Sequence, residues 1–391
     1  MLTQLLQPEI QEFIKQHTHD DVSKLALQKN PFSGVEWVEV VNQVAARQKA
    51  ETKLPTWFGK NSIIYPSKIS VEQTSSETAA RYKSGLVSGD ALIDMTGGFG
   101  IDDYYFSKAV RHVTHCEMNV GLSAIAKHNF EVLGADNIEC LPGDSLDVLT
   151  LTDRKWNWMY IDPSRRNDAK GKVFMLKDCL PNVPDLLSTY FEYTDNIMVK
   201  TAPLLDISAG LKELHSVKAI HVVALNNEVK ELLWILQKGF EGYPLTVAVN
   251  LTKTGIEVFE NPMGNEAIPT FSLPKKYLYE PNAAIMKAGA FNEVSKHYGI
   301  GKLHTNTHLY TSDESIAFAG RRFEIEAVIP YQKQEIKQHI EGKRMNVSTR
   351  NFPLTPQELL KKWKIKDGGD TYAFFTTNLT NEKVVLLCRK V

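Results

Sequence analysis

Apolar runs alternate with amphipathic stretches through the middle of the chain, from about residue 91 to residue 251. The runs have the length and the β-branched composition of buried strands, and the stretches between the early ones, such as 122–133, have a helical period. Strands that alternate with helices form a mostly parallel sheet covered on both faces. The predicted strands are Ala91–Met95, Val113–Glu117, Ile138–Leu141, Trp158–Asp162, Asn196–Lys200, Ala219–Leu225 and Leu245–Leu251.

The two flanks of this region follow other patterns. Residues 1–60 show helical spacing, and Ser76 is placed to cap a helix that continues through Tyr82. Prolines interrupt the chain after residue 261, and a small α+β pattern follows. Its predicted elements are a strand at Arg321–Ile329, a helix at Pro356–Trp363, and strands at Tyr372–Thr376 and Val384–Cys388. The predicted domains are therefore a helical domain at 1–72, the sheet domain at 73–268, and two small parts at 269–319 and 320–391.

Composition places the chain among ordinary globular proteins. Of the 391 residues, 43% are hydrophobic and 23% are charged, which excludes a disordered or collagen-like chain. The longest apolar runs are too short to span a bilayer, and the first residues lack the basic and apolar blocks of a secretory signal. The four cysteines form no C-x-x-C pair. We therefore expect a cytoplasmic protein without a membrane segment and without a bound metal.

Charge is distributed unevenly along a chain whose formal net charge is −1. Residues 1–75 are neutral, residues 76–319 carry an excess of seven acidic groups, and residues 320–391 carry an excess of six basic groups. A locally basic segment attracts polyanions, because its attraction to phosphates adds up over neighbouring charges. The alternative is a lysine-rich surface that is merely solvated.

A glycine-rich turn directly follows the first predicted strand, from Asp94 to Asp102 in the sequence DMTGGFGID. Glycines in such a turn permit positive φ and let a ligand approach the backbone closely. The spacing differs from the G-x-G-x-x-G of dinucleotide-binding folds, so a pyrophosphate ligand is the weaker interpretation.

Acidic residues also end the next three predicted strands or follow them at once. They are Glu117, Asp144 and Asp162. Ligands of open parallel sheets bind at the carboxyl ends of the strands, so we expect these acids and Asp94 to line one crevice. A carboxylate at Glu117 can accept both hydroxyls of a ribose, and one at Asp144 can accept an adenine amino group.

With these motifs, residues 73–255 resemble the class I S-adenosylmethionine (SAM)-dependent methyltransferases. The resemblance implies a Rossmann-like, seven-stranded methyltransferase sheet with SAM as the cofactor. It assigns the amino-acid end of SAM to the glycine turn, the ribose to Glu117 and the adenine to Asp144. Relatives also contact the methionine carboxylate just before the turn, although the serines there can equally cap a helix. The implied cofactor residues are Asp94, Thr96, Gly97, Gly98, Phe99, Gly100, Asp102, Glu117, Met118, Asp144, Ser145, Gln73 and Ser76.

Two further resemblances concern the substrate. The pattern of Asp94–Asp102 resembles guanine-N2 RNA methyltransferases of the small-subunit rRNA type. The whole chain resembles a bacterial group in which this core is joined to a ferredoxin-like segment and a C-terminal THUMP-like domain, on the evidence of Tyr279–Ile285 and Phe318–Arg321. THUMP domains are associated with RNA binding, so the resemblance implies rRNA or tRNA as the partner.

The predicted catalytic motif, Asp162-Pro163-Ser164-Arg165, departs from the family pattern. Amino-group methyltransferases typically have Asp/Asn-Pro-Pro followed by an aromatic ring that stacks on the base. An arginine can stack on a base or clamp a phosphate instead. Alternatively, Arg165 and Arg166 pair with acids such as Asp168.

Lys200 and Pro203 follow the fifth strand beside the same crevice, and we assign both to substrate binding together with Arg166. Lys200 can meet a phosphate, or it is simply a surface lysine at a strand end. Asn226–Glu228, after the sixth strand, either lines the pocket or caps the next helix.

The sequence thus favours a SAM-dependent methyltransferase that modifies an exocyclic amine of an RNA base, a purine, with guanine N2 as one candidate. Two alternatives stay open. One is a methyltransferase of a small molecule or a protein, which would have little use for the basic C-terminal segment. The other is an inactive RNA-binding protein that retains the fold, for which the altered catalytic motif is the main support. The sequence does not indicate the oligomeric state.

Overall fold

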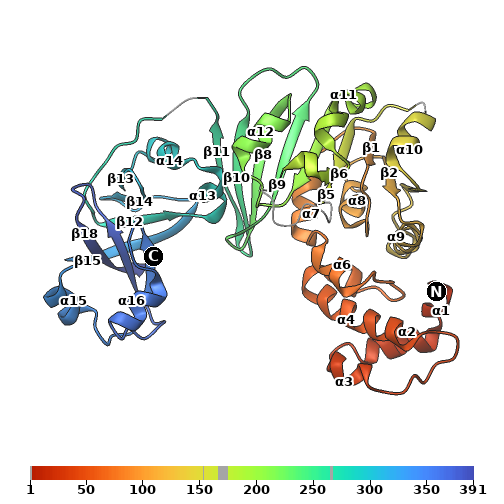
Figure 1. Ribbon diagram of the computed structural model, residues 1–391, viewed down its shortest axis with the longest axis horizontal. Helices are drawn as coiled ribbons and strands as arrows, with labels where there is room; N and C mark the ends of the chain where they lie inside the picture. The colour runs from red at the N-terminus through yellow and green to blue at the C-terminus, as the bar shows by residue number, and fades with distance from the viewer. Residues whose placement is uncertain (1, 153, 166–174, 265–266) are drawn as a thin grey trace. The chain divides into compact units, whose positions relative to one another are not determined.

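The computed structural model describes residues 2–152, 154–165, 175–264 and 267–391 (Figure 1). The chain divides into two compact units. The first consists of Met1–Lys218 and Leu232–Gly242, and the second of Ala219–Glu231 and Tyr243–Val391.

A mostly parallel sheet organises the first unit. Its strand order is β9-β7-β4-β1-β2-β3, and every neighbouring pair is parallel except β7 and β9. A two-stranded ribbon of β5 and β6 accompanies it. The strands are β1 (Ala91–Asp94), β2 (His112–Glu117), β3 (Ile138–Pro142), β4 (Trp158–Ile161), β5 (Ser164–Arg165), β6 (Cys179–Leu180), β7 (Asn196–Thr201) and β9 (Glu228–Gln237).

Helices alternate with these strands, as the sequence predicts for a parallel sheet. They are α8 (Ile101–Phe106), α9 (Val120–Leu133), α10 (Ser145–Leu151), α11 (Val183–Tyr193) and α12 (Ile207–Glu213). The helices described before β1 are α1 (Leu2–Leu5), α2 (Pro8–Gln16), α3 (Val22–Ala26), α4 (Trp37–Lys53), α5 (Pro55–Phe58), α6 (Lys68–Gln73) and α7 (Glu77–Ser84). The predicted helical N-terminus and the predicted Ser76 cap are confirmed, because the Ser76 Oγ accepts the Ala79 N–H at 3.3 Å.

The N-terminal helices share one apolar core with the sheet region. Buried side chains of α2, α4 and α5 pack in the same cluster as Phe99 and Ile101 of the glycine turn and Ile125 of α9. The connector at 61–67 is also attached to α9, since the Asn129 side chain bonds both the N–H and the carbonyl of Ile64, at 3.0 and 2.8 Å. The helical region is therefore a fixed wall of the first unit.

The second unit begins with three strands and continues with a seven-stranded sheet. The three strands have the order β11-β10-β8, and the larger sheet has the order β13-β14-β12-β15-β18-β17-β16. The bounds are β8 (Val217–Leu225), β10 (Leu245–Thr252), β11 (Gly255–Pro262), β12 (Tyr277–Pro281), β13 (Gly301–His304), β14 (Thr307–Ser312), β15 (Gly320–Pro330), β16 (Asn346–Arg350), β17 (Thr371–Thr377) and β18 (Lys383–Lys390), with α13 (Ala283–Ala288), α14 (Phe291–Tyr298), α15 (Lys333–His339) and α16 (Pro356–Lys362).

All seven predicted strands of the central region are present, but the segment after β8 differs from the prediction. Asn226 and Asn227 have φ values of 50° and 67°, a left-handed turn that asparagine tolerates well. The chain therefore turns back at once into strand β9. The prediction of a helix cap at Asn226–Glu228 is wrong, since the turn begins a strand.

A buried carboxylate marks the point where the ferredoxin-like sequence meets the following segment. Glu280 on β12 is 3% exposed and binds Arg321 of β15 and Arg350 of β16. A Cβ on Gly320 would lie 2.2 Å from the Glu280 carbonyl oxygen, so only glycine fits there. A chain that ended near Gly320 would lose both arginine partners, so truncation there would destabilise the part that remains.

A half-buried histidine on β8 gives a testable dependence of stability on pH. Burial lowers the pKa of His221 from 6.5 to about 4. The unfolded chain therefore binds one more proton than the folded chain between pH 6.5 and about 4, and folding stability falls as the pH is lowered through that window. We expect His221→Leu to remove a slope of about 1.4 kcal/mol per pH unit. Urea unfolding between pH 4.5 and 7 measures it, and parallel curves for the two proteins would contradict the expectation.

Candidate functional site

The four predicted acids lie at the carboxyl ends of neighbouring strands. Asp94 ends β1, Glu117 ends β2, Asp144 follows β3, and Asp162 follows β4. In the sheet these strands have the order β4-β1-β2-β3. The topology thus brings the acids to one edge of the sheet, where ligands of open parallel sheets bind.

The glycine turn needs its glycines for two physical reasons. A Cβ on Gly97 would lie 2.2 Å from the ring of the buried His115, so this position admits no side chain. Gly100 has a φ of 80°, and a Cβ there would meet the Phe130 ring at 2.3 Å. These contacts press the turn against β2 and α9 and orient the Gly98 N–H, which donates to the Glu117 Oε2 at 2.9 Å.

A threonine joins the glycine turn to the predicted catalytic motif. The Thr96 hydroxyl accepts the backbone N–H of Asp162 at 2.7 Å and donates to the Asp94 Oδ1 at 3.1 Å. The Thr96 N–H also donates to the same oxygen, at 2.8 Å. The position of Asp162 is therefore tied directly to the first strand's turn.

Asp162 forms an ion pair that sequence reasoning did not foresee. Its Oδ2 binds the Nζ of Lys200, a residue of β7. The Lys200 side chain is 14% exposed and the Asp162 side chain 38%. Within the described part of the chain, the Asp162 Oδ1 has no hydrogen-bond partner. Lys200 thus holds one carboxylate oxygen of Asp162, and the other oxygen is available to accept a hydrogen bond.

The rest of the motif lies at the start of the β5–β6 ribbon. Pro163 is buried, whereas Ser164 and Arg165 are exposed. Ser164 pairs with Leu180 and Arg165 with Cys179, the buried thiol of β6. The predicted substrate residue Arg166, and Asp168 as its alternative partner, lie outside the described residues.

Beneath the turn lies a buried cluster that the sequence did not reveal. His115 Nδ1 is 2.6 Å from the Asp103 Oδ2, and both side chains are fully buried. Burial raises the pKa of Asp94 and of Asp103 well above the usual range. Repulsion from Asp103 raises the pKa of Asp94 further, and repulsion from Asp102 does the same for Asp103. Burial also lowers the pKa of His115. The cluster therefore retains a proton on its carboxyl groups at pH values where exposed acids are ionised.

Asp102 has a structural partner of its own. Its Oδ1 lies 2.9 Å from the Nζ of the fully buried Lys83, and its Oδ2 accepts from the Tyr160 hydroxyl at 2.8 Å and from the Ser75 hydroxyl at 3.0 Å. Burial opposes ionisation of Asp102, but the charges of Lys83 and Lys200, together with hydrogen bonds from Lys83 and Tyr160, outweigh it and lower the pKa of the carboxyl. The Asp102 carboxylate therefore already interacts with three side chains of the protein. Its role in binding the cofactor stays a prediction.

The carboxylates predicted to hold SAM have the chemistry that the cofactor needs. Backbone N–H groups of Gly98 and Asn119 orient the two oxygens of Glu117, at 2.9 and 2.7 Å, and the side chain is only partly buried. Asp144 caps α10 through one oxygen, which accepts the Leu146 N–H at 2.8 Å, and is otherwise exposed. Acceptors with lone pairs to spare at two adjacent strand ends fit a ribose and an adenine amino group.

The remaining predicted site residues differ in how exposed their side chains are to a ligand. Phe99 is buried in the core shared with the N-terminal helices, so only its backbone can meet a ligand. Met118 is 72% exposed, and Gln73 is exposed as well. Ser145 begins α10, and Pro203 is half-buried in the loop after β7.

Comparisons with known proteins agree with this arrangement. Two family models match the C-terminal part: one described as a ferredoxin-like domain covers residues 277–318, and one described as THUMP domain-like covers residues 320–390. The crystal structure of a candidate methyltransferase from Porphyromonas gingivalis W83 is similar over the whole chain. It is 32% identical, the alignment covers 100% of this chain and 98% of that chain, and the TM-score is 0.88.

Two other solved structures match 41% of this chain. An rRNA methylase from Streptococcus thermophilus is 11% identical with a TM-score of 0.29, covering 41% of this chain and 94% of its own. SMU.776, a candidate methyltransferase complexed with SAH, is 13% identical with a TM-score of 0.34, covering 41% of this chain and 48% of its own. Likenesses this weak say nothing about the substrate. Comparison with curated proteins gives no significant match.

The alternating fold, the glycine turn and the full-length relative together define a methyltransferase. The chain belongs to the class I SAM-dependent methyltransferases, in the group that joins this core to a ferredoxin-like segment and a C-terminal THUMP-like domain. The predicted fold class and family are therefore confirmed.

Neither a membrane span nor a metal centre emerges from the described residues. Among them, no helix is both long and apolar enough to cross a bilayer, and no three potential metal ligands gather in one place.

Proposed function

We propose that this methyltransferase transfers the methyl group of SAM to an exocyclic amine of an RNA base. The observation that carries the proposal is the position of Asp162. Its backbone is tied through Thr96 to the turn predicted to hold the cofactor, and its carboxylate is held by Lys200 with one oxygen free to accept a hydrogen bond. Such an acceptor suits an amino group that must be aimed at an electrophilic carbon.

In this scheme the residues of the chain supply geometry. When bound, SAM contributes a methyl group on a positively charged sulfur, which is already a good leaving group. Asp162 accepts one N–H of the target amine and so orients the nitrogen lone pair, with the buried Pro163 fixing the backbone beside it. After transfer, the amine nitrogen carries an extra proton, which Asp162 or water can accept. In this proposal the exposed Arg165 stacks on the base, as an aromatic ring does in amino-group methyltransferases.

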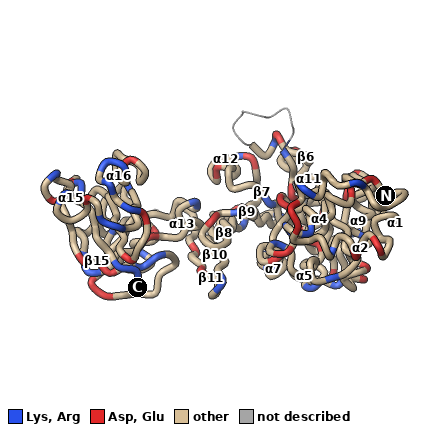
Figure 2. The backbone as a smooth tube through the Cα atoms, turned by 90° about the horizontal axis from the view of Figure 1, so that it is seen from below, with Lys and Arg blue, Asp and Glu red and all other residues tan. Residues whose placement is uncertain are grey.

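An RNA acceptor is supported by the charge of the second unit. Exposed basic residues lie along α15, α16 and the segments that follow them, and we call this set the basic face. Figure 2 marks basic positions on these helices in blue along the backbone. Both helices pack on one apolar core, and the Lys366 N–H donates to the Lys343 carbonyl at 2.9 Å, which joins the two basic segments. The basic face consists of Lys333, Lys337, Lys343, Arg344, Lys361, Lys362, Lys364 and Lys366.

Substitution of the basic face tests its role without disturbing the fold, since these side chains are exposed. We expect the combined change of Lys343, Lys361, Lys364 and Lys366 to glutamine to lower RNA affinity about tenfold or more and to flatten its dependence on salt, because fewer counterions are released. SAM affinity should not change. Fluorescence titrations of a labelled RNA at several salt concentrations measure both quantities. An unchanged salt slope would exclude this surface from RNA binding.

The cofactor assignment is tested at Glu117. We expect Glu117→Ala to weaken SAM binding by about tenfold or more, because a hydroxyl pair loses a charged acceptor and the Gly98 N–H loses its partner. Glu131→Ala, an exposed change on the adjacent α9, is the matched control and should bind SAM normally. Isothermal calorimetry measures both. Equal SAM affinities in the two variants would show that Glu117 does not bind the ribose of SAM.

Methyl-labelled SAM decides the acceptor class. RNA from a strain without this gene is incubated with the protein and labelled SAM, then digested to nucleosides, and the protein and small-molecule fractions of the same extract are counted. We expect label in one nucleoside, at an exocyclic nitrogen. Label only in protein or in metabolites would replace RNA as the substrate. No label in any fraction, with SAM binding intact, would favour a binding protein, an alternative consistent with the Lys200 pairing of Asp162.

A further inference from the structure

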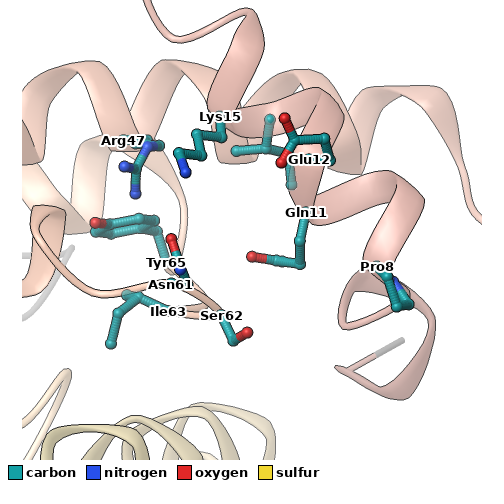
Figure 3. Close-up of a pocket in the computed structure, with 10 residues that line it drawn as sticks. Pro8, Gln11, Glu12, Lys15, Arg47, Asn61, Ser62, Ile63 and Tyr65 are labelled. Atoms are coloured by element: carbon teal, nitrogen blue, oxygen red, sulfur yellow. The ribbon is translucent and has the colours of Figure 1, made fainter.

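We propose that a pocket in the N-terminal helical region binds a phosphate group. The pocket lies between α2, α4 and the connector at 61–65, and its volume is about 190 Å³. Figure 3 shows Lys15, Arg47 and Asn61 converging on it from these three segments. None of the residues that line it belongs to the methyltransferase site described above.

Arg47 supplies a fixed positive charge. Its Nε donates to the Thr18 hydroxyl at 3.1 Å, its Nη2 donates to the Phe58 carbonyl at 3.0 Å, and the guanidinium lies 4.3 Å from the centre of the Phe58 ring. All of these partners are uncharged. Across the described residues, no carboxylate forms an ion pair with Arg47, so a half-buried charge is held in place with donors to spare and without a counter-ion.

The rim carries one further cation and one acid. Lys15 is exposed and forms no ion pair in the described part of the chain, although it lines the same pocket. Glu12, one helical turn earlier, accepts from the Gln16 amide at 2.9 Å. Two cations and one carboxylate leave the lining with a net positive charge, which favours an anion.

Hydrogen-bond donors complete the lining. Ser62 has a φ of 61°, a left-handed conformation that is uncommon for serine, and its carbonyl is bound by the His128 ring at 2.8 Å. This turn places the Asn61 and Ser62 side chains at the pocket, where neither bonds to any described residue. Tyr65 forms the wall, and burial raises the pKa of its hydroxyl, which therefore stays neutral.

Size and donor geometry point to a phosphate group. The pocket has the volume of about six water molecules, enough for a phosphate with part of an attached sugar. A fixed guanidinium, an ammonium, an amide and a hydroxyl can each meet a different oxygen of a tetrahedral anion. The phosphate can come from the RNA backbone, which rests on the proposed function, or from a free nucleotide, which does not.

The site is tested with inorganic phosphate on the full-length protein at constant ionic strength, by the line width of the ³¹P resonance. We expect Lys15→Met to weaken phosphate binding about tenfold, and Glu12→Gln to strengthen it about two- to fivefold because a like charge is removed. Both side chains are exposed, so the fold should be retained. Lys29→Met, which removes an exposed lysine away from the pocket, is the matched control. Equal phosphate affinities in Lys15→Met, Lys29→Met and the unmodified protein would overturn the proposal.

Two competitors then separate the sources. If the site holds RNA backbone, a short single-stranded RNA displaces phosphate. Lys15→Met then reduces the slope of log RNA affinity against log salt concentration by about one. If it holds a nucleotide, AMP displaces phosphate, and Lys15→Met leaves RNA binding unchanged. Both outcomes support the phosphate site. A failure to methylate RNA would disprove the proposed function while leaving the phosphate titrations intact.

Discussion

Replacing Asp162 with alanine should lower methyl transfer strongly and leave cofactor binding almost unchanged. The backbone N–H that donates to Thr96 is unaffected by this change, so the glycine turn should stay in place. What is lost is the anionic acceptor that Lys200 holds in position. A misplaced acceptor nitrogen lowers the rate steeply, and we expect a loss of about 10²-fold or more in turnover.

Measurement of both quantities in the same protein makes this prediction specific. SAM affinity is determined by calorimetry and turnover by transfer of labelled methyl groups. Asp195→Ala is the matched control, because this exposed acid directly precedes β7 and so lies at the amino end of a strand, away from the carboxyl edge. Lys200→Met should lower turnover as well, since the Asp162 carboxylate then loses its anchor. If Asp162→Ala retained full turnover, Asp162 would not orient the acceptor.

A second large effect is expected on stability from Lys83→Met. The Lys83 side chain is fully buried, and its Nζ contacts the Asp102 Oδ1 at 2.9 Å and the Ser75 Oγ at 2.7 Å. Removing the ammonium leaves Asp102 as a buried charge without its counter-ion. Loss of one partner of a buried pair typically costs about 3–5 kcal/mol, so we expect the free energy of unfolding to fall by that order.

The double variant Lys83→Met/Asp102→Asn identifies the cause. It removes both charges and leaves an amide that can still bond Tyr160 and Ser75, so part of the stability should return. Because Lys83 lowers the pKa of Asp102, the contribution of the pair is present above the ordinary aspartate pKa and is lost as the pH falls through the folded value. Urea unfolding at neutral and acidic pH measures these differences. Lys60→Met, an exposed change, should alter stability by less than about 0.5 kcal/mol.

The elements predicted from the sequence were those that local pattern determines. Continuous apolar runs indicate buried parallel strands, and an acid that ends such a run must lie at the carboxyl edge of the sheet. The placement of Asp94, Glu117 and Asp162 follows from that rule alone. The glycine turn could also be predicted from the sequence. At Gly100 the positive φ and the close contact with the Phe130 ring leave glycine as the suitable residue.

Features that depend on contacts between distant segments could not be predicted from the sequence. The sequence of β9, EVKELLWILQ, is rich in helix-forming residues, yet it is buried as an antiparallel strand beside β7, so its surroundings override local preference. Lys83 and Asp102 meet because α7 packs against α8. Lys200 reaches Asp162 only because β7 lies next to β4. The glycine at 97 is consistent with the close approach of the His115 ring to the turn.

The ferredoxin-like and THUMP-like segments share one continuous sheet. Residues 320–324 of β15 pair with β12 of the former segment, and residues 323–330 pair with β18 of the latter. Neither segment can be exchanged for a different domain by recombination at Gly320, because each half would expose a long unpaired strand edge, which invites aggregation. A gene that carries one segment should therefore carry the other, and the two should be inherited as a single module.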